Sequence, residues 1–212
     1  MSRTAEFYFD VGSPASYLAW TQLPRICEET GGTLVYKPML LGGVYQATGN
    51  ASPASIPAKG AYTAIDYARH ARRYGVPYRQ NPYFPIITLT LMRAATGVQM
   101  RQPERLQDFL RAVFNALWFD ALNLNEPQLV ASTLTDAGFD IERVLALTND
   151  PEVKTRCVRP PTKRSHEASS ALPPPSSAST CSSARTASNG FVTRCKASRC
   201  KARRAGDLAP RG

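Results

Sequence analysis

The first forty residues show two periods of apolar positions. Glu6 to Asp10 alternates, is rich in aromatic residues and precedes a Gly-Ser-Pro sequence, so it predicts a short strand. Thr33 to Leu41 predicts a second strand, in which Pro38 is tolerable at an edge or near the end. Between them, Pro14 to Thr30 carries apolar residues at the spacing of one helix face, at Leu18, Ala19, Leu23, Ile26 and Cys27. A strand, a helix and a strand in this order predict a βαβ unit with parallel strands.

The middle of the chain shows helical periodicity only. From Lys59 to Asn149 no segment is convincing as a strand. Pro103, Pro127 and Asp140 lie where helices commonly start, and they support the last three of the predicted helices. The predicted helices are, roughly, 60–75, 87–98, 103–118, 127–137 and 140–148.

Beyond residue 156 the composition changes. Asp150 and Pro151 predict the cap and first position of a further helix. Residues 157–212, however, contain 10 Ser, 6 Pro and 4 Cys with few large apolar side chains, which is too little apolar surface to offset the entropy of ordering them. The sequence therefore predicts that the helix does not continue and that 157–212 is a disordered basic tail.

The net charge of +10 is located in the same tail. Residues 1–156 contain 15 Lys and Arg against 14 Asp and Glu, whereas 157–212 contain 11 against 2. A tail that binds nucleic acid or a membrane surface is one interpretation, although Phe191 is its single aromatic residue, and neither partner is expected. No apolar run is long enough to span a bilayer and no leader precedes the first strand, so a cytoplasmic protein is expected.

Cysteine and histidine do not predict a metal site. Cys27 is the single cysteine before residue 157, and His70 and His166 have no paired ligands. The tail cysteines lack the Cys-x-x-Cys pairs that structural zinc sites use. They are Cys157, Cys181, Cys195 and Cys200.

A shifted reading frame gives a second interpretation of the tail. Read one nucleotide earlier, the codons from Arg156-Cys157 onward permit L-R-A-A-T-D-E-A-V-A-R-G-V-F-G-A-P, and those from Thr180 permit L-F-F-G-Q-D-R-L-E-W-V. The first string would continue the interrupted helix and then begin an apolar strand. We hypothesise a frameshift near residue 156, and an intact frame on resequencing around that codon would overturn the hypothesis.

Ser13 is the best candidate for chemistry, at the junction of the first strand and the first helix. Serine is a preferred N-cap and Pro14 suits the first helical position, so one interpretation is structural. The other is functional, because a hydroxyl at a helix N-terminus lies among free N–H groups and the positive end of the helix dipole, which stabilise a thiolate. Spacing alone leaves both open.

Five short sequences occur in order within residues 5–156: F-Y-F-D-x-x-S-P-x-S-Y-L-A at 7–19, L-L-G-G at 40–43 with T-G-N at 48–50, P-A-K-G at 57–60, R-R-Y-G-V-P at 72–77 and Y-F-P at 83–85. Together they resemble the 2-hydroxychromene-2-carboxylate isomerases, which belong with the kappa-class glutathione transferases and the DsbA-like proteins. The resemblance implies an α/β fold with a thioredoxin-like, DsbA-type βαβ core and an inserted all-helical domain.

The resemblance also implies a domain organisation. Residues 1–42 and 150–156 would form an incomplete thioredoxin-like domain, 43–149 a helical insertion domain, and 157–212 the off-frame tail. In the shifted frame, G-V-F-G-A-P resembles the cis-proline segment and F-F-G-Q-D-R-L the closing strand and helix. The printed chain would then lack the C-terminal half of the thioredoxin core, and we expect poor solubility, with its activity in question.

The activity implied by the resemblance is a glutathione-dependent cis-trans isomerisation of 2-hydroxychromene-2-carboxylate to a hydroxybenzylidenepyruvate, in naphthalene-type catabolism. Glutathione is the implied cofactor, with Ser13 bonding its sulfur and Pro14 beside it. A free thiol has a pKa of about 8.5, which the hydroxyl and helix terminus would lower. We expect thiolate addition to the unsaturated acid, ring opening, rotation about a former double bond, and elimination that returns glutathione.

Further residues are assigned from the resemblance more loosely. Asn50 resembles a glutathione-contacting asparagine but is also an ordinary turn residue. Lys59 is either a partner for the substrate carboxylate or a solvated loop charge. Ile87 stands where the family tends to have Asn, so the resemblance does not extend to a polar contact in the substrate site at this position. Three residues are either walls of the aromatic pocket or helix-start packing: Tyr83, Phe84 and Pro85.

Three alternatives remain beside the isomerase. A kappa-like glutathione transferase acting on electrophiles would use the same thiolate. A dithiol oxidoreductase is disfavoured because Ser13-Pro14-Ala15-Ser16 stands where such proteins carry Cys-x-x-Cys. A nucleic-acid-binding protein that uses the basic tail is the alternative from a different class. The expected partners are glutathione and a small aromatic acid, and the sequence leaves open whether the protein is a homodimer.

Overall fold

The N-terminal segment of the computed structural model is a βαβ unit. Strand β1 (Arg3–Phe9), helix α1 (Pro14–Glu29) and strand β2 (Gly32–Pro38) follow one another. The strands are parallel, with Arg3 opposite Gly32 and Phe9 opposite Pro38. The predicted strands and helix are therefore confirmed, and the proline lies at the end of an edge strand, as expected.

The structure describes residues 3–158 and 194–195. A two-residue strand, β3 (Arg194–Cys195), pairs antiparallel with β1 at Ala5 and Glu6, so the strand order is β2-β1-β3. The disordered tail and the shifted reading frame concern residues that lie almost entirely outside this range. Both stay predictions, as do the domain boundaries.

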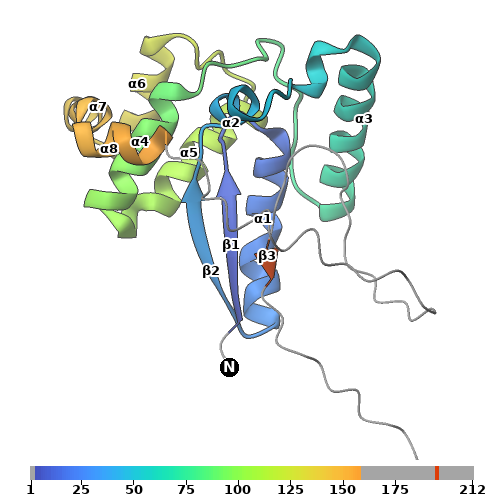
Figure 1. Cartoon of the computed structure of the whole chain (residues 1–212), viewed down its shortest axis with the longest axis horizontal. Coiled ribbons are helices and arrows are strands. Elements are labelled where there is room, and N and C mark those ends of the chain that lie inside the picture. The colour runs from blue at the N-terminus through green and yellow to red at the C-terminus, as the bar shows by residue number, and fades with distance from the viewer. Residues whose placement is uncertain (1–2, 159–193, 196–212) are drawn as a thin grey trace, which may run out of the picture.

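Helices make up the rest of the described chain. In Figure 1, α3 lies on one side of the βαβ unit and α4 to α8 lie on the other, while α2 lies at the carboxyl ends of the strands. The five helices predicted between residues 59 and 149 are present, although η2 precedes α5. The elements after β2 are, in order, α2 (Leu41–Thr48), η1 (Pro53–Ser55), α3 (Pro57–Tyr74), α4 (Leu89–Arg101), η2 (Pro103–Arg105), α5 (Leu106–Trp118), α6 (Pro127–Asp136), α7 (Ile141–Asn149) and α8 (Pro151–Val158).

Two features differ from the prediction. Helix α2 was not predicted, because two glycines in its first turn, Gly42 and Gly43, have low helix propensity. The expectation that the helix at Pro151 would not continue was wrong, since α8 extends over eight residues. Asp150 caps α8 by accepting the Glu152 N–H at 2.8 Å. The carboxylates of Asp150 and Glu152 also form ion pairs with Arg101, the last residue of α4. These ion pairs connect the start of α8 to the end of α4.

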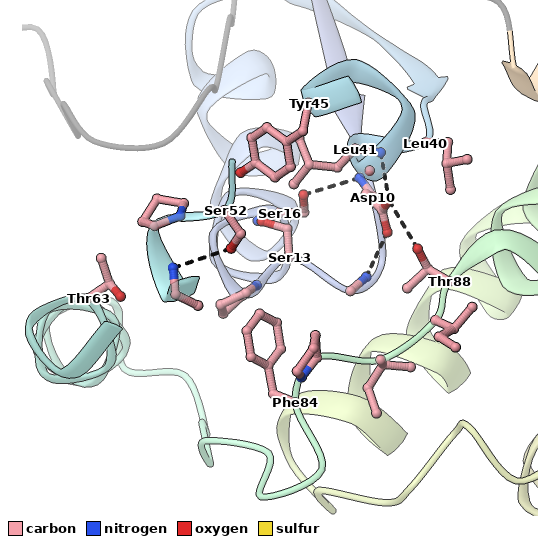
Figure 2. A pocket seen from close by; sticks show the side chains of 18 of the residues that line it. Asp10, Ser13, Ser16, Leu40, Leu41, Tyr45, Ser52, Thr63, Phe84 and Thr88 are labelled. Atoms are coloured by element: carbon pink, nitrogen blue, oxygen red, sulfur yellow. Dashed lines mark hydrogen bonds between the residues drawn. The ribbon is translucent and has the colours of Figure 1, made fainter. Parts of the chain in front are cut away.

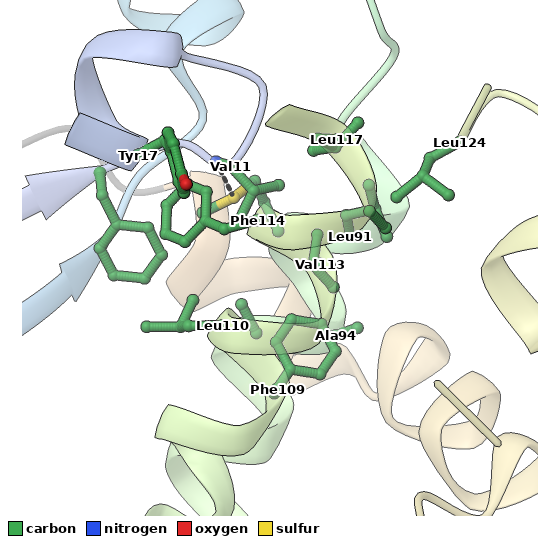
Figure 3. Close-up of a cluster of buried hydrophobic side chains, with 14 of the residues drawn as sticks. Val11, Tyr17, Leu91, Ala94, Phe109, Leu110, Val113, Phe114, Leu117 and Leu124 are labelled. Carbon is green, nitrogen blue, oxygen red and sulfur yellow. Dashed lines mark hydrogen bonds between the residues drawn. The ribbon is translucent and has the colours of Figure 1, made fainter. Parts of the chain in front are cut away.

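One hydrophobic core joins the βαβ unit to the helices (Figure 3). The ring of Phe114 in α5 contacts Phe9 of β1 and Tyr17 of α1, with centroids 6.4 and 5.9 Å apart. The βαβ unit and the helices therefore share one buried core.

Ile26 was expected on the buried face of α1 but is 42% exposed. None of the described helices combines the length and apolar character needed to cross a bilayer.

Candidate functional site

The turn between β1 and α1 holds Ser13 at the start of a helix. Ser13 has an extended backbone, and its Oγ accepts the Ser16 N–H at 3.4 Å, so it is the N-cap of α1, with Pro14 following at the first position. Its own N–H donates to the Asp10 carbonyl at 3.0 Å. Because the hydroxyl acts as an acceptor in the cap, its proton is not used there. Capping and donation to a bound sulfur are therefore compatible.

Ser13 lines a cavity of about 730 Å³. This volume lies in the range of about 300–1,000 Å³ that is typical of small-molecule sites. Its walls come from the β1–α1 turn, the start of α2, η1, one face of α3 and the segment before α4 (Figure 2). Aromatic rings and hydroxyl groups both line it, including Tyr45, Tyr67, Phe84, Ser52 and Thr63.

Four of the predicted site residues line this cavity and three do not. Asn50 is exposed, and its amide donates to Thr48 Oγ1 at 3.1 Å at the end of α2. Lys59 is exposed in the first turn of α3, and Tyr83 is 52% exposed. The structure thus brings together Ser13, Pro14, Phe84 and Pro85, the last two joined by a cis peptide bond.

Ile87 also lines the cavity, although its side chain is 77% exposed. Its main-chain N–H donates to Asn125 Oδ1 at 2.9 Å. The lining of the cavity at position 87 is therefore apolar.

Asp10 is one of the site residues that sequence reasoning missed. It follows β1 directly, is 3% exposed and lines the cavity. The pKa of its carboxyl group is raised because burial outweighs the hydrogen bonds from Leu41, Gly12 and Thr88. The available signal was an acid placed directly after an aromatic strand, at the carboxyl end where parallel sheets bind ligands.

Charge within the cavity is sparse. Among the described residues that line it there is no Lys, Arg or His, and Asp10 is the single acid. The described part of the chain also contains no group of three side chains that could hold a metal ion. Ligand binding here would depend on hydroxyl groups, amides, main-chain N–H groups and aromatic surface.

Comparison with known proteins identifies the fold. The sequence profile of the DSBA-like thioredoxin domain matches residues 4–160. Glutathione S-transferase kappa 1 of Homo sapiens is 28% identical over 164 residues, which cover 74% of this chain and 73% of that protein. The 2-hydroxychromene-2-carboxylate isomerase of Sphingobium xenophagum is 26% identical over 153 residues, which cover 71% and 76%.

A solved structure of a 2-hydroxychromene-2-carboxylate isomerase is similar with a TM-score of 0.60 at 25% identity, covering 72% of this chain and 74% of that chain. The cytosolic disulfide reductase DsbM of Pseudomonas aeruginosa matches with a TM-score of 0.51 at 14% identity, over 72% and 74% of the two chains, which is a likeness of fold alone. The predicted DsbA-type fold is therefore confirmed. The chain belongs to the DSBA-like thioredoxin domain family.

Proposed function

We propose that this protein is a glutathione-dependent enzyme that isomerises a 2-hydroxychromene-2-carboxylate type of substrate. The observation that carries the proposal is Ser13, an N-cap hydroxyl that lines a ligand-sized cavity and whose proton is not used in the cap. Relatives named glutathione transferases and 2-hydroxychromene-2-carboxylate isomerases support it. Since the cytosol maintains reduced glutathione, we also propose that the reaction takes place there.

The cavity has groups that suit a tripeptide thiol. Ser13 would donate its hydroxyl proton to the sulfur, and the N-terminus of α1 would favour the thiolate over the thiol. Ser52 and Gln46 also line the cavity and offer polar contacts for peptide groups. Bound glutathione would supply a sulfur nucleophile that adds to an unsaturated substrate and leaves again. The residues of this chain bind it, keep its sulfur ionised and orient it.

The aromatic side of the cavity suits a planar substrate. Tyr45 of α2, Tyr67 of α3 and Phe84 lie around the same space as Ser13. Their rings would stack against a fused aromatic ring system and keep bulk water from the reacting double bond. An aromatic substrate would thus be held beside the sulfur without a metal ligand or a basic side chain from the described lining.

A transfer reaction is the second candidate. A hydroxychromene carboxylate carries a negative charge, and an acidic ligand usually meets Arg or Lys in its site. The described lining residues include neither, and Lys59 lies outside the lining. This observation favours an uncharged aromatic electrophile, to which the enzyme would join glutathione as a kappa-class transferase does.

The experiment is a titration of the whole chain with glutathione, followed by both assays. Calorimetry measures binding, and the ultraviolet absorbance of the thiolate, followed against pH, gives the thiol pKa in the complex. Isomer formation from a hydroxychromene acid supports the first candidate, and conjugate formation with a neutral electrophile supports the second. Absence of glutathione binding, or turnover without glutathione, would overturn both.

A pair of cap variants separates chemistry from stability. Ser13→Ala and Asp140→Ala each remove an N-cap side chain that accepts a main-chain N–H, and each should cost about 1 kcal/mol of stability. Asp140 caps α7 and does not line the cavity. Ser13→Ala should raise the pKa of the bound thiol and abolish most turnover, whereas Asp140→Ala should leave both unchanged. Equal effects from the two variants would contradict the role of Ser13.

A further inference from the structure

The carboxyl group of Asp10 joins three segments that line the cavity. Its Oδ1 accepts the N–H of Gly12 at 2.9 Å, in the turn just before Ser13. Its Oδ2 accepts the N–H of Leu41 at 2.9 Å, the first residue of α2, and the hydroxyl of Thr88 at 3.1 Å, the N-cap of α4. Figure 2 shows these bonds converging on one side chain. One side chain therefore links all three segments.

The main chain of Asp10 also forms hydrogen bonds with the turn that carries Ser13. Its carbonyl accepts the Ser13 N–H at 3.0 Å, and its N–H donates to Ser16 Oγ at 3.3 Å. Asp10 thus contacts the turn before Ser13, the N–H of Ser13 itself and the first turn of α1. Any displacement of Asp10 moves the Ser13 hydroxyl relative to the cavity.

Burial of the Asp10 carboxyl group lowers the stability of the fold. None of the ion pairs formed by the described residues includes it, and a buried carboxyl group without a cation usually costs stability. The titratable groups that face it electrostatically are Tyr45 of α2 and Cys157 of α8. Neither can carry a positive charge. The cost of burial is therefore not recovered by charge pairing.

We propose that Asp10 is a positioning residue of the thiol site, which fixes the Ser13 turn against the N-termini of α2 and α4. This inference rests on the proposed glutathione-dependent function. A negative charge near the bound sulfur would disfavour the thiolate, so Asp10 would act through geometry and not through its charge. Its hydrogen bonds hold the Ser13 hydroxyl where it can donate to sulfur.

The variant Asp10→Asn separates geometry from charge. It replaces one carboxyl oxygen by an amide NH₂, which must then face the N–H of either Gly12 or Leu41. One main-chain donor loses its acceptor in either orientation, and the turn shifts. If Asp10 acts by position, the pKa of the bound glutathione thiol rises by at least about one unit, which is a tenfold fall in the acid dissociation constant of that thiol. If only its charge matters, that pKa falls, which would overturn the inference.

Two threonine variants of α4 provide the matched comparison. Thr88→Val keeps the shape of the side chain and removes its bond to Asp10, so it should raise the thiol pKa in the same direction by a smaller amount. Thr96→Val makes the same exchange at a buried residue outside the cavity lining, whose hydroxyl bonds Met92 O in its own helix at 2.7 Å, and should leave the thiol pKa unchanged. If Asp10→Asn does not fold, Thr88→Val decides the question alone.

Each outcome has one meaning. Wild-type protein that does not bind glutathione in the calorimeter overturns the proposed function. Wild-type protein that binds glutathione, with an unchanged thiol pKa in Asp10→Asn and Thr88→Val, overturns the positioning role alone. Equal shifts in Thr88→Val and Thr96→Val would also overturn it, because the effect would then come from general loss of stability.

Discussion

Substitution of Gly12 by alanine should disrupt the turn that carries Ser13. A Cβ atom at this position would lie 2.5 Å from Thr88 Cγ2, about 1 Å inside ordinary van der Waals contact. The backbone of Gly12 does not have a positive φ, so the strain comes from this contact alone. Relief requires Thr88 or the turn to move. We expect a loss of about 1–3 kcal/mol in the free energy of unfolding, typical of overpacked cores.

The assay is urea denaturation of the full chain with circular dichroism, supported by calorimetric melting. The matched control is Gly42→Ala, in the first turn of α2, where a Cβ meets nothing within 4 Å. Because alanine favours the helix over glycine, this variant should be neutral or more stable by up to about 1 kcal/mol. Glutathione binding should weaken in Gly12→Ala, whereas Gly42→Ala is a control for stability only, because Gly42 also lines the cavity.

A second substitution tests the stated cause. Thr88→Ser removes the clashing methyl group and keeps the hydroxyl that bonds Asp10. The nearest atoms to the new Cβ would then be Asp10 Oδ1 at 3.5 Å and Thr88 Cβ at 3.7 Å, both ordinary contacts. The double variant should therefore be more stable than the sum of the two single effects. Strict additivity, or a Gly12→Ala variant as stable as Gly42→Ala, would refute the reasoning.

Three further predictions concern buried residues. Gly97→Ala should cost about 1–3 kcal/mol in urea denaturation, and Leu147→Ala should not rescue it, because the opposing atom at 2.8 Å is Leu147 Cβ. Trp118→Phe should cost about 1–3 kcal/mol in the same assay, since it leaves the Val11 carbonyl without the indole N–H at 2.9 Å; an unchanged midpoint would contradict this. Because the pKa of Asp10 is raised in the folded state, its contribution to stability is full below the ordinary aspartate pKa of 3.8 and is lost as the pH rises through the folded pKa. Melting curves recorded from below pH 3.8 to neutral pH should therefore show that wild type loses stability relative to Asp10→Asn as the pH rises. A stability difference between the two proteins that does not change with pH would contradict the raised pKa.

Local patterns predicted most of the fold. The alternation before Asp10 and the helical spacing after Pro14 define the βαβ unit because both depend on burial of one face. Helix α2 escaped prediction because Gly42 and Gly43 weaken its local propensity, while its position at the end of β2 comes from tertiary contacts such as the Asp10 bond to Leu41. Local spacing cannot encode a contact between residues 31 positions apart.

The candidate site was predicted in part for the same reason. Ser13 and Pro14 were found from helix-start chemistry, which is local. Phe84 reaches the cavity through the path of a long connection, and only the resemblance to a family indicated it. Thr88 and Asp10 were missed, because their bond spans 78 positions and a single acid after a strand has many ordinary roles.

The indole of Trp118 gives the protein a built-in optical probe. It donates to the Val11 carbonyl beside the Ser13 turn, and its ring centroid lies 6.2 Å from that of Phe84, which lines the cavity. The sequence contains two tryptophans, so a Trp20→Phe protein would emit from this buried indole alone. Ligands that shift the turn or Phe84 should change the colour and intensity of that emission, and occupancy could then be followed without a label.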